Sequence, residues 1–369
     1  MKTLQLVPAM EQGGVERGVV EINRAIVSAG WENVVVSAGG RLAERIESAG
    51  GRHVLMDVKS KNPLTYLSRA AALRRLLEKE RPDVVCAHSR VPAWLFVRAG
   101  RGLGIPWITF AHGANSVSRY SKVMTAGDLV VTPSRYIADY LKAAYGTDEA
   151  KIRVIPRAVE RERFDPQRLD QSFVEAKRRE WRTEGRTVVM GVGRITRLKG
   201  FDMLVRAVGR LRDQGATGKD GRPFMLVIVG EAEELRKDVE VELRSLVASL
   251  DLEDSVVFAG NQSKVAECIS IADVVVSSNT EKPEAFGRSM AEALAMERPV
   301  VAKAFGGALD VVRDGLDGTL VRDGDFAAAI EKTAKMQFDG AAARRSVLDR
   351  FSFDRMVELS LSVYRELKK

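Results

Sequence analysis

Two stretches of the sequence combine charged residues and glycines in a spacing that suits a diphosphate and a sugar. Residues 193–200 read GRITRLKG, so Arg194 and Lys199 lie five residues apart on a loop that follows an apolar run. A guanidinium and an ammonium held on one loop form a cradle for a diphosphate. Open parallel sheets bind their ligands at such strand ends. We therefore predict a diphosphate-binding loop, with a solvent-exposed basic loop as the alternative.

Residues 282–292, KPEAFGRSMAE, supply two carboxylates on either side of a predicted helix start. Glu284 falls in a loop, Gly287 opens the helix and Glu292 lies within it. Carboxylate oxygens accept hydrogen bonds from hydroxyls, so Glu292 suits a ribose diol and Glu284 the hydroxyls of a sugar. Gly287 would leave room for phosphate oxygens beside the free N–H groups of the helix. The alternative for Glu292 is a surface ion pair, although its apolar neighbours favour an inward-facing carboxylate that needs a partner.

The first half of the chain has weaker signals at corresponding places. Gly13 and Gly14 follow the first predicted strand and open a helix, where backbone N–H groups can approach a ligand. A tight turn is the alternative, and the absence of a GxGxxG pattern argues against a dinucleotide cofactor. His88 and His112 each follow a predicted strand. We predict a functional role for His112, and for His88 a functional and a structural role remain open.

Short apolar runs alternate with amphipathic stretches along the whole chain, as βαβ units require. The predicted strands are 3–7, 33–37, 54–58, 83–87, 107–111, 129–132, 188–192, 225–229, 256–259, 274–277, 300–302 and 319–321. The predicted helices are 15–29, 64–80, 201–211, 232–250, 263–271, 288–296 and 353–367. The fold class is therefore α/β, with two Rossmann-like, doubly wound domains that face each other across a cleft.

The chain of 369 residues is long enough for two domains. We predict a first domain over 1–160, a connector over 161–186 that is partly helical over 173–181, and a second domain over 187–350. Residues 351–369 are predicted to form a helix that packs back toward the first domain.

The composition of the chain indicates the cell compartment and the classes of partner to expect. Two cysteines in different halves exclude a disulfide framework and fit a reducing cytosol. No apolar run reaches the roughly 20 residues that span a bilayer, and the N-terminus lacks the pattern of a signal peptide, so we expect a cytoplasmic location. The entire net charge of +8 falls in residues 1–156. The basic residues are dispersed, without an aromatic platform, which argues against nucleic acid.

The motifs together resemble the GT-B glycosyltransferases of the retaining family 4 type. The resemblance rests on GGVER (13–17), TPSRY (132–136), GRITRLKG, EAFGRSMAE and Gly306-Gly307, and it covers nearly the whole chain. Two positions depart from the family pattern. Ala285 stands where glycine is usual, and Arg288 stands where an apolar residue is usual, so contact of Arg288 with the diphosphate and exposure to solvent both remain open.

The resemblance implies roles for individual residues. Arg194 and Lys199 would neutralise the diphosphate, Glu292 would hold the ribose, and Glu284 would contact the donor sugar. The backbone after Glu284 would add contacts through Ala285, Phe286, Gly287 and Arg288. From the first domain, Gly13 and Gly14 would approach the phosphates and His112 would contact the donor sugar. The catalytic set would be His112, Glu284, Arg194 and Lys199, with no metal ion and no cofactor.

The resemblance also implies a nucleotide-diphosphate sugar as donor. A UDP-sugar is the first expectation, with GDP- and ADP-sugars as alternatives. The expected acceptor is a cell-envelope glycan or glycolipid, in lipopolysaccharide core or surface polysaccharide. The alternative function is that of a nucleotide-sugar epimerase or a phosphorylase. The basic residues of the first half would suit a phosphorylated acceptor or the anionic inner face of the plasma membrane, on which the protein would be peripheral; they are Arg17, Arg24, Lys59, Lys61, Arg69, Arg74 and Arg75.

Overall fold

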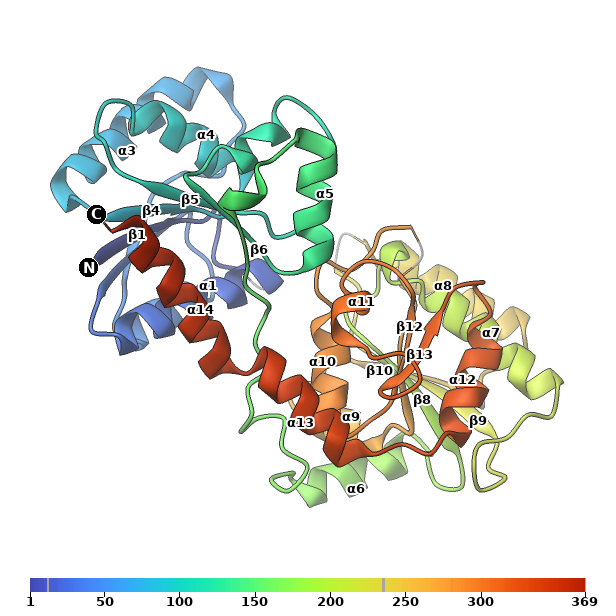
Figure 1. Cartoon of the computed structure of the whole chain (residues 1–369). Coiled ribbons are helices and arrows are strands. Elements are labelled where there is room, and N and C mark those ends of the chain that lie inside the picture. Colours follow the sequence, from blue (N-terminus) through green and yellow to red (C-terminus); the bar gives the residue numbers. More distant parts are fainter. Residues whose placement is uncertain (12, 234–235, 280, 369) are drawn as a thin grey trace. The chain divides into compact units, whose positions relative to one another are not determined.

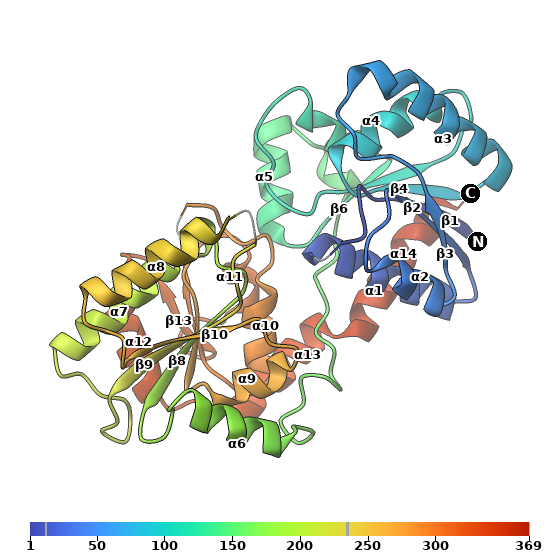
Figure 2. The ribbon, with the colours of Figure 1, turned by 180° about the vertical axis from the view of Figure 1, so that it is seen from behind.

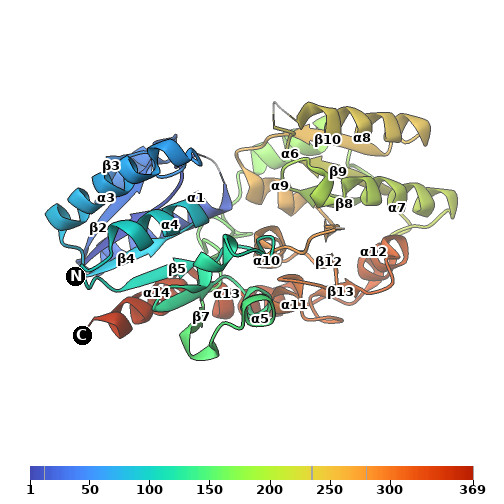
Figure 3. The same cartoon turned by 90° about the horizontal axis from the view of Figure 1, so that it is seen from above.

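The computed structural model describes residues 1–11, 13–233, 236–279 and 281–368 and divides the chain into two compact units. Unit 1 comprises Met1–Arg157 and Asp354–Lys369, and unit 2 comprises Ala158–Phe353. Residues 161–186, predicted as a connector, therefore belong to unit 2, as do residues 158–160, which were predicted in the first domain. The chain leaves unit 2 after its last helix and contributes one final helix to unit 1 (Figure 3).

Unit 1 is a parallel sheet covered by helices on both faces (Figure 1). Within the described residues the strand order is β3-β2-β1-β4-β5-β6-β7. The strands are β1 (Lys2–Leu6), β2 (Glu32–Ser37), β3 (Arg52–Leu55), β4 (Val84–Ala87), β5 (Trp107–Phe110), β6 (Leu129–Thr132) and β7 (Ile152–Val154). The helices are α1 (Gly14–Ser28), α2 (Ala43–Ser48), α3 (Tyr66–Glu80), α4 (Arg90–Ala99), α5 (Arg135–Tyr145) and α14 (Phe353–Leu367).

Side-chain alternation along β1 directs its residues to two different layers. Leu4 and Leu6 are fully buried in the core beneath α3 and α4. Gln5 lies between them and, because successive side chains point to opposite faces, reaches the other layer. There Gln5 Nε2 donates to Tyr364 Oη of α14 at 3.1 Å. Figure 2 shows α3 and α4 on one side of this sheet and α1, α2 and α14 on the other. The central strand thus ties the C-terminal helix to unit 1.

Unit 2 is a second parallel sheet, with the order β10-β9-β8-β11-β12-β13 among the described residues. Its strands are β8 (Thr187–Val192), β9 (Phe224–Val229), β10 (Val256–Gly260), β11 (Val274–Ser277), β12 (Val300–Lys303) and β13 (Gly318–Val321). Its helices are α6 (Gln171–Glu180), α7 (Phe201–Asp213), α8 (Lys237–Ser249), α9 (Val265–Ile271), α10 (Arg288–Ala295), α11 (Ala308–Val311), α12 (Phe326–Lys335) and α13 (Gly340–Phe351). One apolar core lies under α7, α8 and α12, and the other under α6, α9, α10 and α13.

In both units the chain order reverses next to the first strand, so that β1 lies between β2 and β4 and β8 lies between β9 and β11. These are the places where a doubly wound sheet opens a crevice at the carboxyl ends of its strands. The predicted doubly wound α/β fold is confirmed for both units.

Several elements differ from the sequence prediction. Strand β3 is Arg52–Leu55 rather than 54–58, and α8 begins at Lys237 rather than 232. Helix α4 was not predicted; its Pro92 is tolerated because it lies in the first turn, where the missing N–H has no helical partner. Strand β7 has three half-buried residues, too few for a periodic signal. Among the described residues no helix is both long and apolar enough to cross a membrane.

Candidate functional site

The basic loop of unit 2 begins where β8 ends and is held in an unusual backbone conformation. Gly193 has φ +145°, a region open to glycine but rarely to other residues. The backbone of Gly230, after β9, packs on it so closely that a Cβ on Gly230 would lie 2.0 Å from the Gly193 oxygen. A short 3₁₀ turn, Arg197–Lys199, then leads into α7. Strand, turn and helix therefore fix the loop that carries the predicted cations.

Lys199 and Glu284, 85 positions apart in sequence, form an ion pair through Nζ and Oε1. Both side chains are about one quarter exposed, at 26% and 24%. Ser278, which follows β11 and is 1% exposed, donates from Oγ to the Lys199 carbonyl at 2.8 Å. Because β8 and β11 are neighbours in the sheet, these contacts join their two loops into one surface. The structure brings together the predicted phosphate-binding cation and the predicted sugar-binding carboxylate.

A glycine pair after β12 supports the loop that carries Glu284. The Gly307 N–H donates to the Glu284 carbonyl at 2.8 Å. A Cβ on Gly307 would lie 2.4 Å from the Phe286 oxygen, and one on Gly306 would lie 2.2 Å from Pro283 Cβ. Only glycine permits this approach, so Gly306 and Gly307 set the position of Glu284.

Helix α10 begins directly after this loop. Gly287 is its N-cap at φ +93°, and a Cβ there would lie 1.9 Å from Met290 Cε. Arg288 and Glu292 are half-buried and one turn apart, so they share a face of the helix. Ala285 is half-buried. The Phe286 side chain is 4% exposed and packs edge-on against Phe351 at 5.1 Å, so only its backbone is available to a ligand.

Arg194 lies apart from the Lys199–Glu284 pair. Its guanidinium forms an ion pair with Glu233, and both side chains are more than half exposed. Glu233 stands in the segment that follows β9, the neighbour of β8. Arg194 is therefore held at the rim of the loop by the Glu233 carboxylate.

The predicted glycines of unit 1 stand at the start of α1. Gly13 is the N-cap, and a Cβ there would lie 2.4 Å from Glu16 Oε2. Gly14 is exposed, and a Cβ there would meet nothing within 4 Å. The Glu16 carboxylate thus lies over Gly13, at the positive end of the helix. Gly14 leaves its backbone open to an approaching group.

His112 of unit 1 stands in a continuous hydrogen-bonded chain of side chains. Arg157 Nη2 contacts His112 Nδ1 at 2.5 Å, and His112 Nε2 contacts His88 Nδ1 at 3.0 Å. His88 Nε2 contacts Gln5 Oε1 at 2.8 Å, and Gln5 continues to Tyr364 of α14. We call these five residues the histidine chain. It joins β1, the ends of β4 and β5, and α14. Its last member, Arg157, ends the Met1–Arg157 part of unit 1.

The direction of every bond in the histidine chain follows from one donor. Arginine only donates, so His112 Nδ1 accepts and the neutral ring carries its proton on Nε2. His112 then donates to His88 Nδ1, and His88 donates from Nε2 to Gln5 Oε1. Because Gln5 accepts through Oε1, its amide nitrogen remains to donate, and Nε2 does donate to Tyr364 Oη. Both imidazoles are therefore neutral and each holds one tautomer.

The electrostatic environment keeps both imidazoles neutral. Burial, helped by the Arg157 charge, lowers the pKa of His88 to about 3. The same two causes, with His88 itself, place the pKa of His112 well below its ordinary value. His88 also stacks on Phe110, with ring centroids 4.4 Å apart. A general acid or base that works near neutral pH needs a pKa close to 7. His112 is instead suited to positioning and hydrogen bonding.

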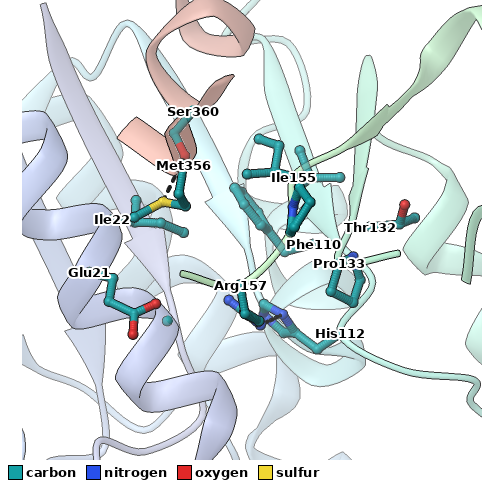
Figure 4. A pocket seen from close by; sticks show the side chains of 13 residues that line it. Glu21, Ile22, Phe110, His112, Thr132, Pro133, Ile155, Arg157, Met356 and Ser360 are labelled. Carbon is teal, nitrogen blue, oxygen red and sulfur yellow. Dashed lines mark hydrogen bonds between the residues drawn. The ribbon is translucent and has the colours of Figure 1, made fainter. Parts of the chain in front are cut away.

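A small pocket beside His112 is lined by residues of α1, the ends of β5 and β6, and α14 (Figure 4). Arg157 crosses it to His112, and Glu21 of α1 lies on the opposite side (Figure 4). A Cβ on Gly18 would lie 2.1 Å from Arg157 Nη1, so the guanidinium rests directly on the α1 backbone. Gly18 therefore makes room for the arginine that orients His112.

Sequence reasoning missed the residues that support this site. Arg157, Gln5 and Tyr364 act only through tertiary contacts, and no local spacing marks them. Gln5 gave one signal, since a polar side chain inside the apolar run LQLV must find a buried partner. Ser278 and Glu233 had no sequence signal. Among the described residues no cluster of three His, Cys, Asp or Glu side chains is placed to hold a metal ion.

The chain matches known proteins in both units. The model of Glycosyltransferase Family 4 matches residues 12–163, and that of Glycosyl transferases group 1 matches residues 173–346. A D-inositol 3-phosphate glycosyltransferase of Acidothermus cellulolyticus is 30% identical over 340 residues, which cover 84% of this chain and 73% of that protein.

Solved structures agree with the family match. A glycosyltransferase from Rickettsia africae has a TM-score of 0.88 at 29% identity, covering 100% of this chain and 98% of its own. Anabaena Alr3699/HepE, in complex with UDP and glucose, has a TM-score of 0.81 at 21% identity and shares the fold over 100% of this chain and 99% of its own. Two family models, a relative covered over most of its length and the doubly wound units lead to one conclusion: the chain belongs to the family 4 glycosyltransferases of GT-B fold.

Proposed function

We propose that the protein transfers a glycosyl group from a nucleotide-diphosphate sugar to an acceptor, with retention of the anomeric configuration. The observation that carries the proposal is the Lys199–Glu284 pair at the carboxyl end of the unit 2 sheet. Without a ligand the two side chains neutralise each other. With the donor bound, Lys199 would turn to the diphosphate and Glu284 would accept hydrogen bonds from sugar hydroxyls.

In this proposal catalysis comes mainly from stabilising the leaving group. As the glycosidic bond to the diphosphate breaks, negative charge develops on the phosphate oxygens. Lys199 and Arg194, once the bound donor has released them from Glu284 and Glu233, would stand with the first N–H groups of α10 at that edge of the sheet. Donors that are in place before the bond breaks stabilise the developing charge. The acceptor attacks from the face that the diphosphate leaves. Attack on that face retains the anomeric configuration without a carboxylate nucleophile, and a diphosphate oxygen takes the proton that the acceptor hydroxyl loses.

The remaining predicted residues have supporting roles. Glu292, half-buried on α10, would bind the ribose diol, and Gly14 would approach the phosphates with its backbone. His112, held neutral with both ring nitrogens engaged, would present its backbone and ring edge to the donor sugar. Ala285, Phe286, Gly287 and Arg288 would line the sugar through their backbone, and Gly13 would set the start of α1.

A direct assay separates transfer from the alternative of an epimerase or a phosphorylase. The protein is incubated with UDP-glucose, GDP-mannose or ADP-glucose, with and without acceptor extracts, and released nucleoside diphosphate is measured. If the protein transfers a glycosyl group, the release of nucleoside diphosphate should depend on the acceptor. NMR of the product should then show the same anomeric configuration as in the donor. Epimerised nucleotide sugar without an acceptor, or glycosyl phosphate formed from free phosphate, would contradict transfer.

We propose a UDP-sugar as donor, with GDP- and ADP-sugars as alternatives, and no metal or cofactor requirement. Two protein cations face the diphosphate, which supplies the charge that a divalent ion would otherwise provide. Activity is therefore expected to persist in EDTA. Strict dependence on Mg²⁺ or Mn²⁺ would contradict this part of the proposal.

For the acceptor we propose a cell-envelope glycan or glycolipid, met at the cytoplasmic face of the membrane. Support comes from the exposed basic residues of unit 1, including Lys59, Lys61 and Arg75. Arg74 does not belong with them, because it pairs with Glu78 and donates to the Arg101 carbonyl at 2.9 Å. An anionic membrane attracts each such residue by about 1 kcal/mol.

A sedimentation assay tests the membrane part of the proposal. The combined change Lys59→Glu and Arg75→Glu should reduce binding to phosphatidylglycerol vesicles at least tenfold. Arg206→Glu, an exposed change on α7 of unit 2, serves as the control. Equal binding to neutral and anionic vesicles would contradict the electrostatic attraction.

A further inference from the structure

The last turn of α13 contacts the loop that carries Glu284 and the short helix that supports this loop. Helix α13 packs along α10, which begins where the Glu284 loop ends. Arg350 of α13 contacts the end of α11, and Phe351 contacts Phe286 of the loop itself. Two neighbouring residues therefore connect the proposed donor site to a helix that has no role in the proposed function so far.

Arg350 completes a helix that is too short to be stable alone. Helix α11 has four residues, and a single helical turn is marginal without outside contacts. The carbonyls at its end also lack partners within the helix. Arg350 Nη1 donates to the Asp310 carbonyl at 2.8 Å, and Nη2 donates to the Val311 carbonyl at 3.0 Å. The planar guanidinium thus binds two neighbouring carbonyls at once and fixes the end of α11.

The start of α11 connects this contact to Glu284. Gly307 is the N-cap of α11, and its N–H donates to the Glu284 carbonyl at 2.8 Å. The Val311 N–H donates to the Gly307 carbonyl at 3.1 Å, so one helical turn joins Gly307 to the carbonyls that Arg350 binds. A shift of α11 would therefore disturb the hydrogen bond that holds the Glu284 backbone.

Phe351 supports the same loop through a ring contact. The side chains of Phe351 and Phe286 are buried, and their rings meet edge to face, with planes at 84°. Aromatic pairs favour this arrangement. The Arg350 guanidinium lies over the Phe351 ring, 4.7 Å from its centroid. The guanidinium and the two rings thus form one continuous set of contacts, which ends two residues after Glu284.

The last turn of α13 is held in place by contacts outside the Glu284 loop. The Val159 N–H donates to the Phe351 carbonyl at 2.8 Å, and the Ser352 N–H donates to the Leu348 carbonyl at 2.9 Å. Val159 is buried in the same apolar core as Phe286 and Phe351. A group can position a loop only if it is fixed independently of that loop, and the Val159 contact meets this requirement.

We propose that Arg350 and Phe351 are positioning residues, which hold the Glu284 loop where its carboxylate meets the sugar of the donor. The assignment rests on the proposed function for the donor, whereas the support of the loop needs no ligand. Hydrogen bonds weaken steeply when their geometry changes, so a loosened loop would lose the sugar first. The nucleotide would lose less, because Lys199 and Glu292 belong to other elements, the loop after β8 and the body of α10.

Hydrogen exchange of the full-length protein tests the support of the loop without a ligand. Mass spectrometry of peptides over residues 304–313 reports on the Gly307 N–H, which binds the Glu284 carbonyl. Arg350→Met keeps the length of the side chain and Phe351→Leu keeps it apolar. Each should raise exchange in these peptides at least fivefold, and Arg350→Lys should restore part of the protection. Peptides of β9 and α7 should exchange as in wild type, which separates a loosened loop from a general loss of stability.

Two control variants make matched changes in the other core of unit 2. Arg212→Met removes a guanidinium that donates to the Leu250 and Asp251 carbonyls at the end of α8. Phe326→Leu removes a buried ring at the start of α12. Neither change should alter exchange over residues 304–313.

The exchange experiment decides the support of the loop whatever the protein binds. Exchange over residues 304–313 that is the same in Arg350→Met, Phe351→Leu and wild type would overturn the positioning role. Exchange that rises equally across unit 2 in these variants would overturn it as well, since the two residues would then only stabilise the core.

Calorimetry of UDP-glucose and of UDP tests whether the supported loop serves the sugar. Both ligands contain the nucleotide, so the ratio of their dissociation constants isolates the contribution of the sugar. In Arg350→Met and Phe351→Leu the Kd for UDP-glucose should rise at least fivefold relative to the Kd for UDP. The Kd for UDP itself should change less than threefold. GDP-mannose with GDP, and ADP-glucose with ADP, are measured in the same way.

The two measurements distinguish failure of the positioning role from failure of the proposed function. A nucleotide sugar that binds with the same ratio in wild type, Arg350→Met and Phe351→Leu would overturn the positioning role and leave the proposed function intact. If wild type binds none of the three nucleotide sugars, the proposed function is contradicted together with the sugar part of the assignment. The exchange over residues 304–313 then still shows whether α13 supports the loop.

Discussion

At the scale of single residues, the candidate site of unit 2 is a cation and a carboxylate, Lys199 and Glu284, that form an ion pair. Lys199 and Glu284 are each about one quarter exposed, so their pairing has a modest effect on stability. In the proposed function their proximity serves binding instead, because it would place opposite charges beside the diphosphate and the sugar of the donor. The two residues are therefore expected to matter far more for transfer than for folding.

Replacing Lys199 by alanine should lower the rate of transfer at least 100-fold, because one fixed cation opposite the leaving group disappears. Glu292→Ala should cause a comparable loss by removing the ribose contact. The melting temperature of both proteins should stay within a few degrees of wild type. Arg206→Ala, on the exposed side of α7, is the control. Turnover near that of wild type in either site variant would refute the assignment of that residue.

The neutral histidines give a pH dependence of stability with a definite sign. The folded-state pKa of His88 is about 3, below the ordinary value near 6.5. Between these two pKa values the imidazole of His88 is protonated in the unfolded chain and neutral in the folded one. The stability that the neutral, buried His88 contributes is therefore present above pH 6.5 and is lost as the pH falls. For each such histidine the free energy of unfolding should fall by up to about 1.4 kcal/mol per pH unit below pH 6.5.

Urea unfolding at pH 7.5, 6.5 and 5.5 measures this slope, in a range where most carboxylates stay charged. The free energy of unfolding should fall with pH in wild type and should fall less steeply in His88→Asn. The same slope in both proteins would show that His88 does not titrate as its burial requires.

At the scale of elements, the site depends on loops that only glycine allows to meet. The turn after β12 lies against the Glu284 loop, with a Gly307 Cβ position 2.4 Å from the Phe286 oxygen. Gly307→Ala should push the two loops apart, weaken nucleotide-sugar binding at least tenfold and lower the melting temperature. Unchanged binding and stability would mean that the loops can separate without consequence.

Unlike Gly307, Gly14 has space for a side chain. A Cβ there would meet nothing within 4 Å, and the residue opens α1 without a positive φ. Alanine should therefore stabilise the helix by up to about 1 kcal/mol, as alanine does relative to glycine. If Gly14 admits phosphate oxygens to its backbone, Gly14→Ala should still weaken donor binding. Thermal unfolding and calorimetry together test this, and unweakened donor binding would remove Gly14 from the site.

The sequence predicted the elements with regular patterns and the site residues that share a local motif. GRITRLKG and EAFGRSMAE marked Lys199 and Glu284, and buried strands such as 274–277 were predicted at their observed ends. The histidine chain could not be predicted in the same way. Gln5, Arg157 and Tyr364 come from distant parts of the sequence and meet only when β1, the end of the first segment and α14 have packed.

At the scale of the whole molecule, the two units carry different kinds of chemistry. The net charge of +8 lies in residues 1–156, whereas the predicted diphosphate-binding cations, Arg194 and Lys199, lie in residues 157–369, which have a net charge of zero. The positive charge of unit 1 is thus not needed for the donor. We propose that it serves the acceptor instead.

Helix α14 closes unit 1 although it comes last in the chain. Tyr364 is 1% exposed and accepts from Gln5, so it completes the histidine chain. Tyr364→Phe should cost about 1–2 kcal/mol of stability by leaving the Gln5 amide without its partner. Transfer should fall only a fewfold, because His112 keeps its bond from Arg157. Chemical denaturation and steady-state kinetics test this. Unchanged stability and unchanged transfer would show that Tyr364 has no part in the histidine chain.

The central claim is that Lys199 and Glu284 form the donor site and that no metal ion takes part. The most direct test is calorimetric titration of UDP-, GDP- and ADP-sugars in EDTA, with wild type, Lys199→Ala and the control Arg206→Ala. A bound ligand also raises the melting temperature by mass action, which gives a second readout. We predict that one nucleotide sugar binds wild type and Arg206→Ala equally and binds Lys199→Ala at least tenfold more weakly. Equal binding to all three proteins, or binding only when Mg²⁺ is added, would contradict the claim.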